Sequence, residues 1–167
     1  NNINDADAAL QIVKEFDHPA AVAVKHNNPC GVGTGETIYE AFSKAYAADP
    51  TSIFGGIIAL NRAVDEDTAK LLHEIFLEIA IAPAYTEAAL AVLQSKKNLR
   101  ILKIPYTNMQ QEKKLASVEG GLLVQDADHL TLDDAELTIP TKRKPTEEEW
   151  NALKLAWRVV KHVKSNA

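Results

Sequence analysis

Short, fully apolar runs recur along the first two-thirds of the chain. Residues 20–24, 56–60 and 79–82 carry no polar side chain at any position. Strands that are covered on both faces have this uninterrupted pattern. Residues 99–104 instead mix apolar and basic side chains in the manner of a half-covered strand. The pattern therefore predicts four strands.

Apolar residues at helical spacing separate these runs. A first helix is predicted from Asp5, which can cap it, to about Phe16, with Leu10, Ile12 and Val13 facing inward. Three further helices are predicted. The first runs through Ile38, Phe42 and Tyr46, and the second begins at Asp65 and has Leu72, Ile75 and Phe76 on one face. The third is capped by Thr86 and runs through Leu90 and Leu93. Strands that alternate with helices favour right-handed βαβ units, so we expect an α/β fold on a largely parallel sheet.

Two segments depart from this alternation. The glycine-rich stretch 31–35 is predicted to be a turn. Residues 105–145 contain one strand candidate, at 121–124, and an acidic stretch from 126 to 136. Long irregular connections inside a domain are usually functional or mobile. We expect such a connection here, within a single domain that spans residues 1–167.

A last amphipathic helix is predicted near the end of the chain. Thr146 and Glu149 have the spacing of a capping box. The apolar residues that follow form one helical stripe, whose tryptophans we expect in the core: Trp150, Leu153, Trp157 and Val160. The basic cluster at 142–144, flanked by prolines, is expected to be a solvated loop.

Composition and charge narrow the class of protein. The chain is 46% hydrophobic and 25% charged, as globular domains are, and its formal charge of −5 argues against a general nucleic-acid binder. No apolar run reaches the ~20 residues of a membrane span. The lone cysteine, Cys30, allows no intrachain disulfide, and we expect a cytoplasmic protein. The chain has neither an initial Met nor a signal-peptide pattern, and it stops just after the amphipathic helix, so we expect both ends to be cuts through a longer chain.

The segment from Lys25 to Gly31, Lys-His-Asn-Asn-Pro-Cys-Gly, is the most informative for chemistry. It places two ionisable side chains and two amides at the carboxyl end of a predicted strand, where open α/β sheets bind ligands. A neighbouring ammonium disfavours imidazolium, so Lys25 can keep His26 neutral and able to accept a proton. Lys25 can also stabilise negative charge on a carbonyl oxygen. A strand-end turn with two solvated side chains explains the same spacing, and spacing alone leaves both interpretations open.

Three familiar motifs do not fit this segment. A dinucleotide fingerprint needs glycine where Glu36 stands, and no Walker-type Gly-Lys-Ser/Thr is present. Pro29-Cys30 matches half of the zinc signature of nucleoside deaminases, but Gly33 stands in place of its second cysteine. A zinc site of that type cannot be built, so we expect no catalytic metal. The alternative to an enzyme is a non-catalytic module whose role is the assembly of a larger protein.

Two further positions are candidates for ligand contact. Phe54 can lie against a planar ring, while Gly55 and Gly56 let backbone amides approach that ring. A turn with a core phenylalanine fits the spacing equally well. Glu78, next to the third apolar run, can bind amino or hydroxyl donors, and an ordinary surface carboxylate is the alternative.

Together these strings resemble a known family. Residues 25–31 and 49–60, followed in order by 76–83 and 95–99, are similar to the bifunctional purine biosynthesis enzymes that join AICAR transformylase to IMP cyclohydrolase. The similarity runs along the whole chain. It implies a three-layer α/β/α, cytidine-deaminase-like subdomain with a largely parallel mixed sheet, the first of two in the transformylase region. No cyclohydrolase activity is expected from this segment.

The resemblance also implies a reaction and its site residues. The reaction is transfer of a formyl group from the co-substrate 10-formyltetrahydrofolate to the 5-amino group of AICAR. The family's catalytic residues match Lys25, His26 and Asn166, and its AICAR contacts match Phe54, Gly55 and Glu78. The resemblance further implies a homodimer in the full-length protein and an isolated fragment that is inactive. From charge and hydropathy we expect no nucleic-acid or membrane partner.

Overall fold

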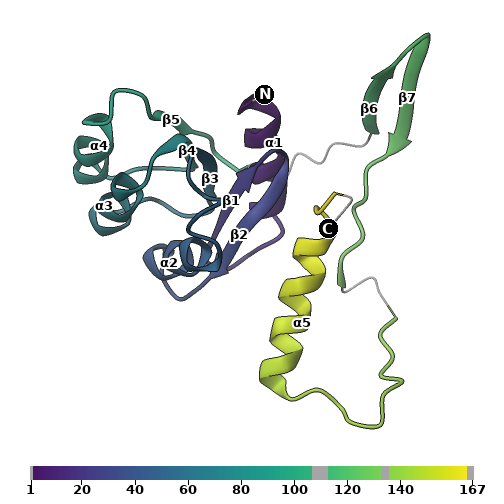
Figure 1. Cartoon of the computed structure of the whole chain (residues 1–167). Helices are drawn as coiled ribbons and strands as arrows, with labels where there is room; N and C mark the ends of the chain where they lie inside the picture. The colour runs from purple at the N-terminus through teal and green to yellow at the C-terminus, as the bar shows by residue number, and fades with distance from the viewer. Residues whose placement is uncertain (1, 107–112, 133–135, 165–167) are drawn as a thin grey trace. The chain divides into compact units, whose positions relative to one another are not determined.

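The computed structural model describes residues 2–106, 113–132 and 136–164 (Figure 1). The chain divides into two compact units, one made of residues 1–106 and 155–167 and the other of residues 107–154. No helix among the described residues is long and apolar enough to cross a membrane. The candidate site residues Lys25, His26, Phe54, Gly55 and Glu78 all belong to the first unit.

A five-stranded mixed sheet forms the centre of the first unit, with the strand order β2-β1-β3-β4-β5 (Figure 1). Its strands are β1 (Ala20–Lys25), β2 (Asn28–Thr34), β3 (Gly56–Leu60), β4 (Leu77–Ala82) and β5 (Arg100–Lys103). The three strands β3, β4 and β5 are parallel, whereas β1 runs antiparallel to both β2 and β3. The predicted mixed sheet is confirmed, but its parallel part is confined to three strands.

One face of the sheet is covered by α1 (Asn2–Val13). Ile12 and Val13 of this helix share a buried cluster with Val22 and Val24 of β1. Leu155 and Val159 of α5 (Glu147–Val160) pack against the same cluster. This face therefore carries a helical layer formed by the two ends of the chain.

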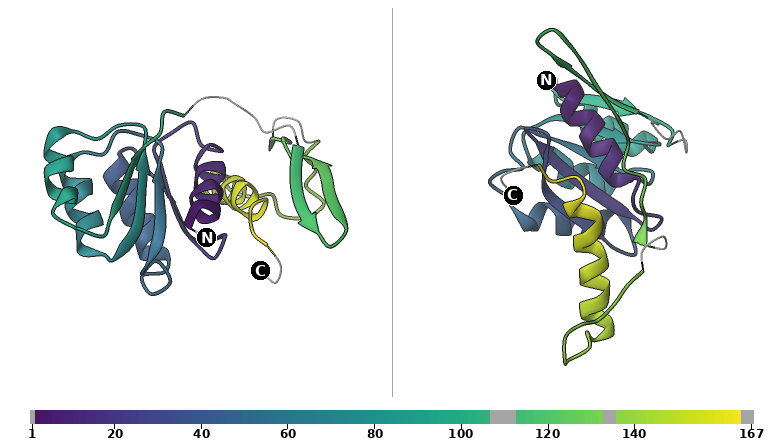
Figure 2. Two further views of the ribbon diagram at one scale, coloured as in Figure 1. Left: turned by 90° about the horizontal axis from the view of Figure 1, so that it is seen from above. Right: turned by 90° about the vertical axis from the view of Figure 1, so that its right-hand side faces the viewer.

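The opposite face is covered by three helices, as the view in Figure 2 (left) shows. They are α2 (Ile38–Ala48), α3 (Glu66–Glu74) and α4 (Glu87–Gln94). Phe42, Leu72 and Leu93 pack there with Ala21 and Ala23, the β1 residues that alternate with those facing α1. The predicted three-layer α/β/α architecture is confirmed.

The glycine-rich segment 31–35, which we expected to be a turn, instead lies largely in strand β2. Gly31 and Gly33 face the backbone of α2: a Cβ on either would lie 2.1 Å from a carbonyl oxygen, that of Ala45 or Ala41. The glycines thus permit close approach of a helix rather than a turn. Strand β2 reverses the direction of the chain beside β1, and α2 then connects β2 to β3 on the other side of β1. As a result β1 is antiparallel to both of its neighbours.

Side-chain caps define the starts of the covering helices. Asp65 and Thr86 cap α3 and α4, as predicted, and accept hydrogen bonds from the amides three residues on. Thr37 caps α2 in the same way. The cap predicted at Asp5 is wrong, because α1 begins at Asn2 and Asp5 lies within its first turns.

The second unit contains a two-stranded hairpin where we expected irregular chain. Strand β7 (Gly121–Asp126) covers the predicted strand at 121–124, and its antiparallel partner β6 (Lys113–Val118) was not predicted. Every residue of both strands is exposed. Neither strand is therefore buried by other described residues of this chain. A two-stranded hairpin without such packing is only marginally stable in water.

The final helix, α5, begins as its sequence predicts. The Thr146 amide donates to the Glu149 carboxylate at 2.9 Å and the Glu149 amide donates to the Thr146 hydroxyl at 3.2 Å. The expectation that its tryptophans are core residues is wrong: Trp157 is 47% exposed, in one stripe with the exposed Leu153 and Val160. The inward side of α5 carries Leu155 and Val159 instead. The loop 142–144 is exposed, as expected.

A partly buried carboxylate connects the residue stretch after α1 with the residues after α5. The Glu15 Oε1 atom accepts from His162 Nε2 at 2.9 Å and lies 3.0 Å from Lys161 Nζ. Burial raises the pKa of Glu15, but the hydrogen bonds from His162 and Lys161 outweigh it, so that this pKa lies below its ordinary value of 4.5. The ionised form is therefore the one that the fold stabilises.

Replacing Glu15 with Gln is expected to lower the free energy of unfolding by about 1.5–3 kcal/mol at neutral pH, because a charged hydrogen-bond acceptor is lost. Since the Glu15 pKa is depressed in the folded state, its contribution is complete above pH 4.5 and is lost as pH falls through the folded pKa. Urea unfolding at pH 7 and pH 3 measures this. Glu74→Gln, at an exposed position of α3, is the control; equal effects of both substitutions at both pH values would contradict the assignment.

Candidate active site at the amino ends of the parallel strands

The candidate residues meet at one edge of the sheet. Antiparallel pairing sets Val24 opposite Ile57, so the end of β1 lies beside the start of β3. Parallel pairing sets Gly56 opposite Leu77, which brings the start of β4 to the same edge. We expected these residues at the carboxyl ends of a parallel sheet. They lie instead at the carboxyl end of β1 and the amino ends of β3, β4 and β5, because β1 is antiparallel to β3.

Lys25 ends β1 with a half-buried side chain. Its Nζ atom donates to the Phe54 carbonyl oxygen at 2.6 Å. A Cβ on Gly55 would lie 4.0 Å from this Nζ, so the glycine leaves space beside the ammonium. An ammonium has three N–H donors, and this carbonyl fixes the group in place while using one of them.

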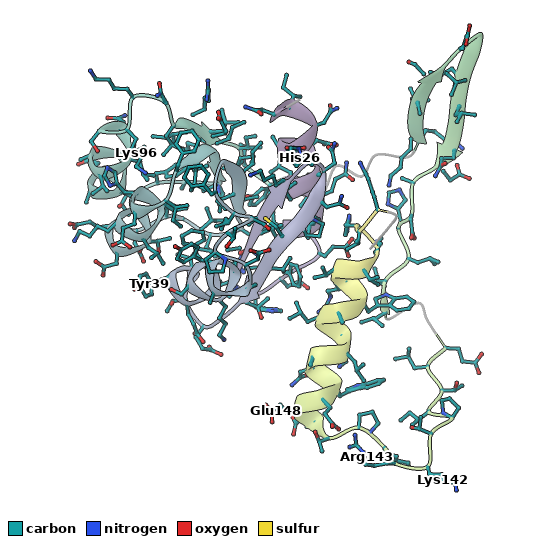
Figure 3. All side chains as sticks on the ribbon, viewed as in Figure 1. His26, Tyr39, Lys96, Lys142, Arg143 and Glu148 are labelled. Carbon is teal, nitrogen blue, oxygen red and sulfur yellow. The ribbon has the colours of Figure 1, made fainter. Side chains whose placement is uncertain are left out.

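His26 and Asn27 form the tight turn between β1 and β2. Both have left-handed backbone conformations, with φ of 54° and 62°. The His26 and Asn27 amides donate to the two carboxylate oxygens of Asp5, at 3.2 Å and 2.8 Å. The His26 side chain is exposed, at the end of β1 beside α1 (Figure 3). An imidazole in this place can exchange protons with a bound ligand.

Asn28 connects the same turn to the end of the chain. Its Oδ1 atom accepts from the Lys164 amide at 2.9 Å, and its Nδ2 lies 3.5 Å from the His26 carbonyl oxygen. The chain after α5 therefore returns to the turn that carries His26. Asn166, the third predicted catalytic residue, lies outside the described residues.

An exposed aromatic pair lies next to Lys25. Phe54 is 59% exposed, so the alternative of a core phenylalanine does not hold. Its ring centroid lies 5.2 Å from that of Phe76. Gly55 joins the two segments: its amide donates to the Phe76 carbonyl oxygen at 2.8 Å, and its φ of 72° suits glycine. The pair offers apolar faces for a planar ring.

Phe76 departs from the sequence prediction. We expected it on the inward face of a helix with Ile75, but α3 ends at Glu74 and Phe76 is 43% exposed. The extended backbone at Ile75 turns successive side chains to opposite sides, so Ile75 is buried and Phe76 is not. The position of this aromatic residue directly before a buried strand was the sequence signal that could have placed Phe76 at the candidate site.

Glu78 is the acidic residue of this edge. Its carboxylate accepts from Arg100, the first residue of β5, at 2.5 Å. The Glu78 side chain is 30% exposed and that of Arg100 is 58% exposed, so this ion pair adds little stability. Arg100 was not predicted, because only the parallel register of β4 and β5 brings it beside Glu78.

Other reactive side chains lie apart from this arrangement. Burial raises the pKa of the Cys30 thiol, which disfavours the nucleophilic thiolate. His73 and Ser95 share a hydrogen bond of 2.9 Å near the ends of α3 and α4. In residues 2–106, 113–132 and 136–164, no group of three or more His, Cys, Asp and Glu side chains is placed to hold a metal ion.

Comparisons with known proteins give a consistent result. The sequence model of the AICARFT/IMPCHase bienzyme family matches residues 1–167. The "Bifunctional purine biosynthesis protein PurH" of Halalkalibacterium halodurans is 71% identical over 168 residues, which are 100% of this chain and 33% of that protein. Proteins of the same name from Shouchella clausii and Bacillus subtilis are 66% and 67% identical, with the same coverage. This chain thus spans about a third of the length of these curated relatives.

Among solved structures, the apo form of dCMP deaminase from the cyanophage S-TIM5 is similar, with a TM-score of 0.46 and 16% identity. The match covers 61% of this chain and 97% of that one.

Proposed function

This chain belongs to the AICARFT/IMPCHase bienzyme family, and on that premise we propose that it forms part of an AICAR transformylase site. The reaction would pass a formyl group from 10-formyltetrahydrofolate to the 5-amino group of AICAR. The observation that carries the proposal is that an ammonium, an exposed aromatic pair and a carboxylate lie at the same end of the sheet as the His26 turn. These are the groups that an aminoimidazole carboxamide and its formylation require.

His26 is the proposed proton acceptor. The AICAR amine is a poor nucleophile, because its lone pair is delocalised into the imidazole ring and the carboxamide. Attack on the formyl carbon forms a C–N bond and requires that the amine lose a proton, which a neutral imidazole can take directly or through the carboxamide. Breaking the bond to the folate nitrogen completes the transfer, and that nitrogen receives a proton. The exposure of His26 gives such a ligand access.

Lys25 is the proposed donor to the oxygen of the tetrahedral intermediate. Its ammonium is held by the Phe54 carbonyl at 2.6 Å and keeps further N–H donors for a ligand. Fixed donors stabilise developing negative charge without reorganising during the reaction. Asn166 is the proposed second donor. The contact between Lys164 and Asn28 supports this, because it brings the chain two residues before Asn166 to the catalytic turn.

Phe54, Gly55 and Glu78 are the proposed AICAR contacts. The exposed face of Phe54 suits the planar imidazole, and Gly55 lets the base approach the backbone. The Glu78 carboxylate can accept from amino or hydroxyl groups of the nucleotide, in exchange for its exposed partner Arg100. Binding of the ligand therefore does not require that a buried ion pair be broken.

We assign residues 1–167 to the first cytidine-deaminase-like subdomain of a cytoplasmic, homodimeric protein, with the remaining folate and phosphate contacts on other parts of it. The exposed apolar residues of the hairpin and α5 support this, since isolated globular domains rarely leave so many uncovered: Leu115, Leu122, Val124, Leu153 and Trp157. No cyclohydrolase activity is assigned to this segment.

Formyl transfer should need more than these residues. We expect the isolated chain to transfer formyl groups more than about 10³-fold slower than a chimera in which it replaces the matching third of the Halalkalibacterium halodurans relative, because the substrates are not jointly positioned. The assay follows tetrahydrofolate release with AICAR present. Comparable rates for both would contradict the assignment of partial function, and an inactive but folded chimera would contradict the proposed reaction.

A further inference from the structure

We infer that Asp5 is a positioning residue for His26, an inference that rests on the formyltransferase function proposed above. Asp5 lies on α1, 21 residues before His26. It accepts both amide hydrogens of the turn: His26 N lies 3.2 Å from Oδ2 and Asn27 N lies 2.8 Å from Oδ1. One carboxylate therefore fixes the backbone that carries the proposed proton acceptor.

The turn needs such an anchor. Left-handed backbone costs a residue other than glycine roughly 1–2 kcal/mol, and both His26 and Asn27 adopt it, with φ of 54° and 62°. Two successive amides that point at one group form an anion-binding concavity, and Asp5 supplies the anion. With its amide oriented to place nitrogen against acceptors, the Asn27 side chain also donates to Asp5, at 3.2 Å. Three hydrogen bonds thus hold the strained conformation.

The anchor itself is rigid. Asp5 precedes a row of buried α1 residues that fix the helix on the sheet: Ala6, Ala9, Ile12 and Val13. The nearby Asp7 behaves differently, since its exposed carboxylate accepts from Gln11 within the same helix at 2.6 Å. Asp5 therefore transmits the position of a packed helix to the His26 turn, and Asp7 serves as a matched control.

The consequence concerns the imidazole. The Cα–Cβ direction from which it extends follows from the backbone conformation that Asp5 stabilises. A displacement of about 1 Å in a reacting group can reduce the rate about 10²-fold. AICAR binding, in contrast, depends in our proposal on Phe54, Gly55 and Glu78, whereas the Asp5 carboxylate accepts from the His26 and Asn27 amides.

Kinetics of the chimera described above test the inference. Asp5→Asn is expected to lower kcat about 10- to 100-fold with KM for AICAR changed by less than about threefold. Asp7→Asn should leave both unchanged. In a double-mutant cycle, Asp5→Asn should have no further effect once His26 is alanine, because Asp5 acts through that side chain. Independent, multiplicative effects of the two substitutions would overturn the inference.

Amide hydrogen exchange provides a readout besides activity. The His26 and Asn27 amides should exchange slowly in the unaltered protein, although His26 is exposed, and at least about tenfold faster in Asp5→Asn than in Asp7→Asn. Unprotected amides in the unaltered protein would overturn the inference without any variant. If His26→Ala keeps full activity, the proposed function fails; if His26→Ala is inactive but Asp5→Asn matches Asp7→Asn, only the role of Asp5 fails.

Discussion

Replacing His26 with alanine in the full-length chimera is expected to lower kcat for formyl transfer by about 10²–10⁴-fold, the usual contribution of a general base. The affinity for AICAR should change by less than about threefold, or ~0.7 kcal/mol. The two effects separate because His26 takes the amine proton, whereas the aromatic pair and Glu78 hold the nucleotide. Steady-state kinetics and calorimetric titration with AICAR measure them.

His129→Ala is the matched control, since this histidine is exposed and belongs to the other compact unit. It should leave both kcat and the AICAR affinity unchanged. A His26→Ala enzyme with full kcat would remove His26 from the mechanism. Parallel losses of binding and rate would instead make His26 a binding residue, and the proton would need another acceptor.

The strands were the part of the fold that the sequence predicted best. β3 occupies the predicted residues 56–60, and the runs at 20–24 and 79–82 fall within β1 and β4. These strands are buried on both faces, so hydrophobicity alone identifies them. Strand direction was beyond reach, because periodicity is the same in either direction. Because strand β2 was not predicted, the antiparallel direction of β1 could not be predicted either.

The predictions that failed concern residues whose role depends on a distant neighbour. Gly31 and Gly33 resemble turn residues, but they are required where α2 approaches. The apolar stripe of α5 resembles a core face, but no part of the described chain covers it. Both patterns are compatible with several environments, and the environment is set by packing that local sequence does not encode.

The candidate site shows the same division. Lys25, Phe54, Gly55 and Glu78 were predicted because each is a polar, aromatic or glycine residue beside an apolar strand, and the strand registers bring these segments to one end of the sheet. Asp5 was interpreted as a helix cap, since an acidic residue early in a helix usually has that role. Its bonds to the His26 turn connect segments 21 residues apart and follow only from the packing of α1.

The close approach of α2 to β2 leads to the largest expected effect on stability. We expect Gly33→Ala to lower the free energy of unfolding by about 3 kcal/mol, as severe overpacking does. A Cβ at Gly33 would lie 2.1 Å from the Ala41 carbonyl oxygen and 2.5 Å from the Ala45 amide nitrogen. Both are backbone atoms, so relief requires a shift of the whole helix, whose Phe42 is fully buried.

Urea unfolding followed by circular dichroism measures this change. Gly121→Ala is the control, because nothing lies within 4 Å of the added methyl group, and its effect should stay within about 0.5 kcal/mol. The strain should also reach the site, since β2 pairs with β1 up to Lys25 opposite Asn28 and so frames the His26 turn. A Gly33→Ala chimera should therefore lose kcat even where it is fully folded. Equal stability of the Gly33 and Gly121 variants would mean that the backbones of α2 and β2 do not touch. The expected effect of Gly33→Ala on the His26 turn would then have no structural basis.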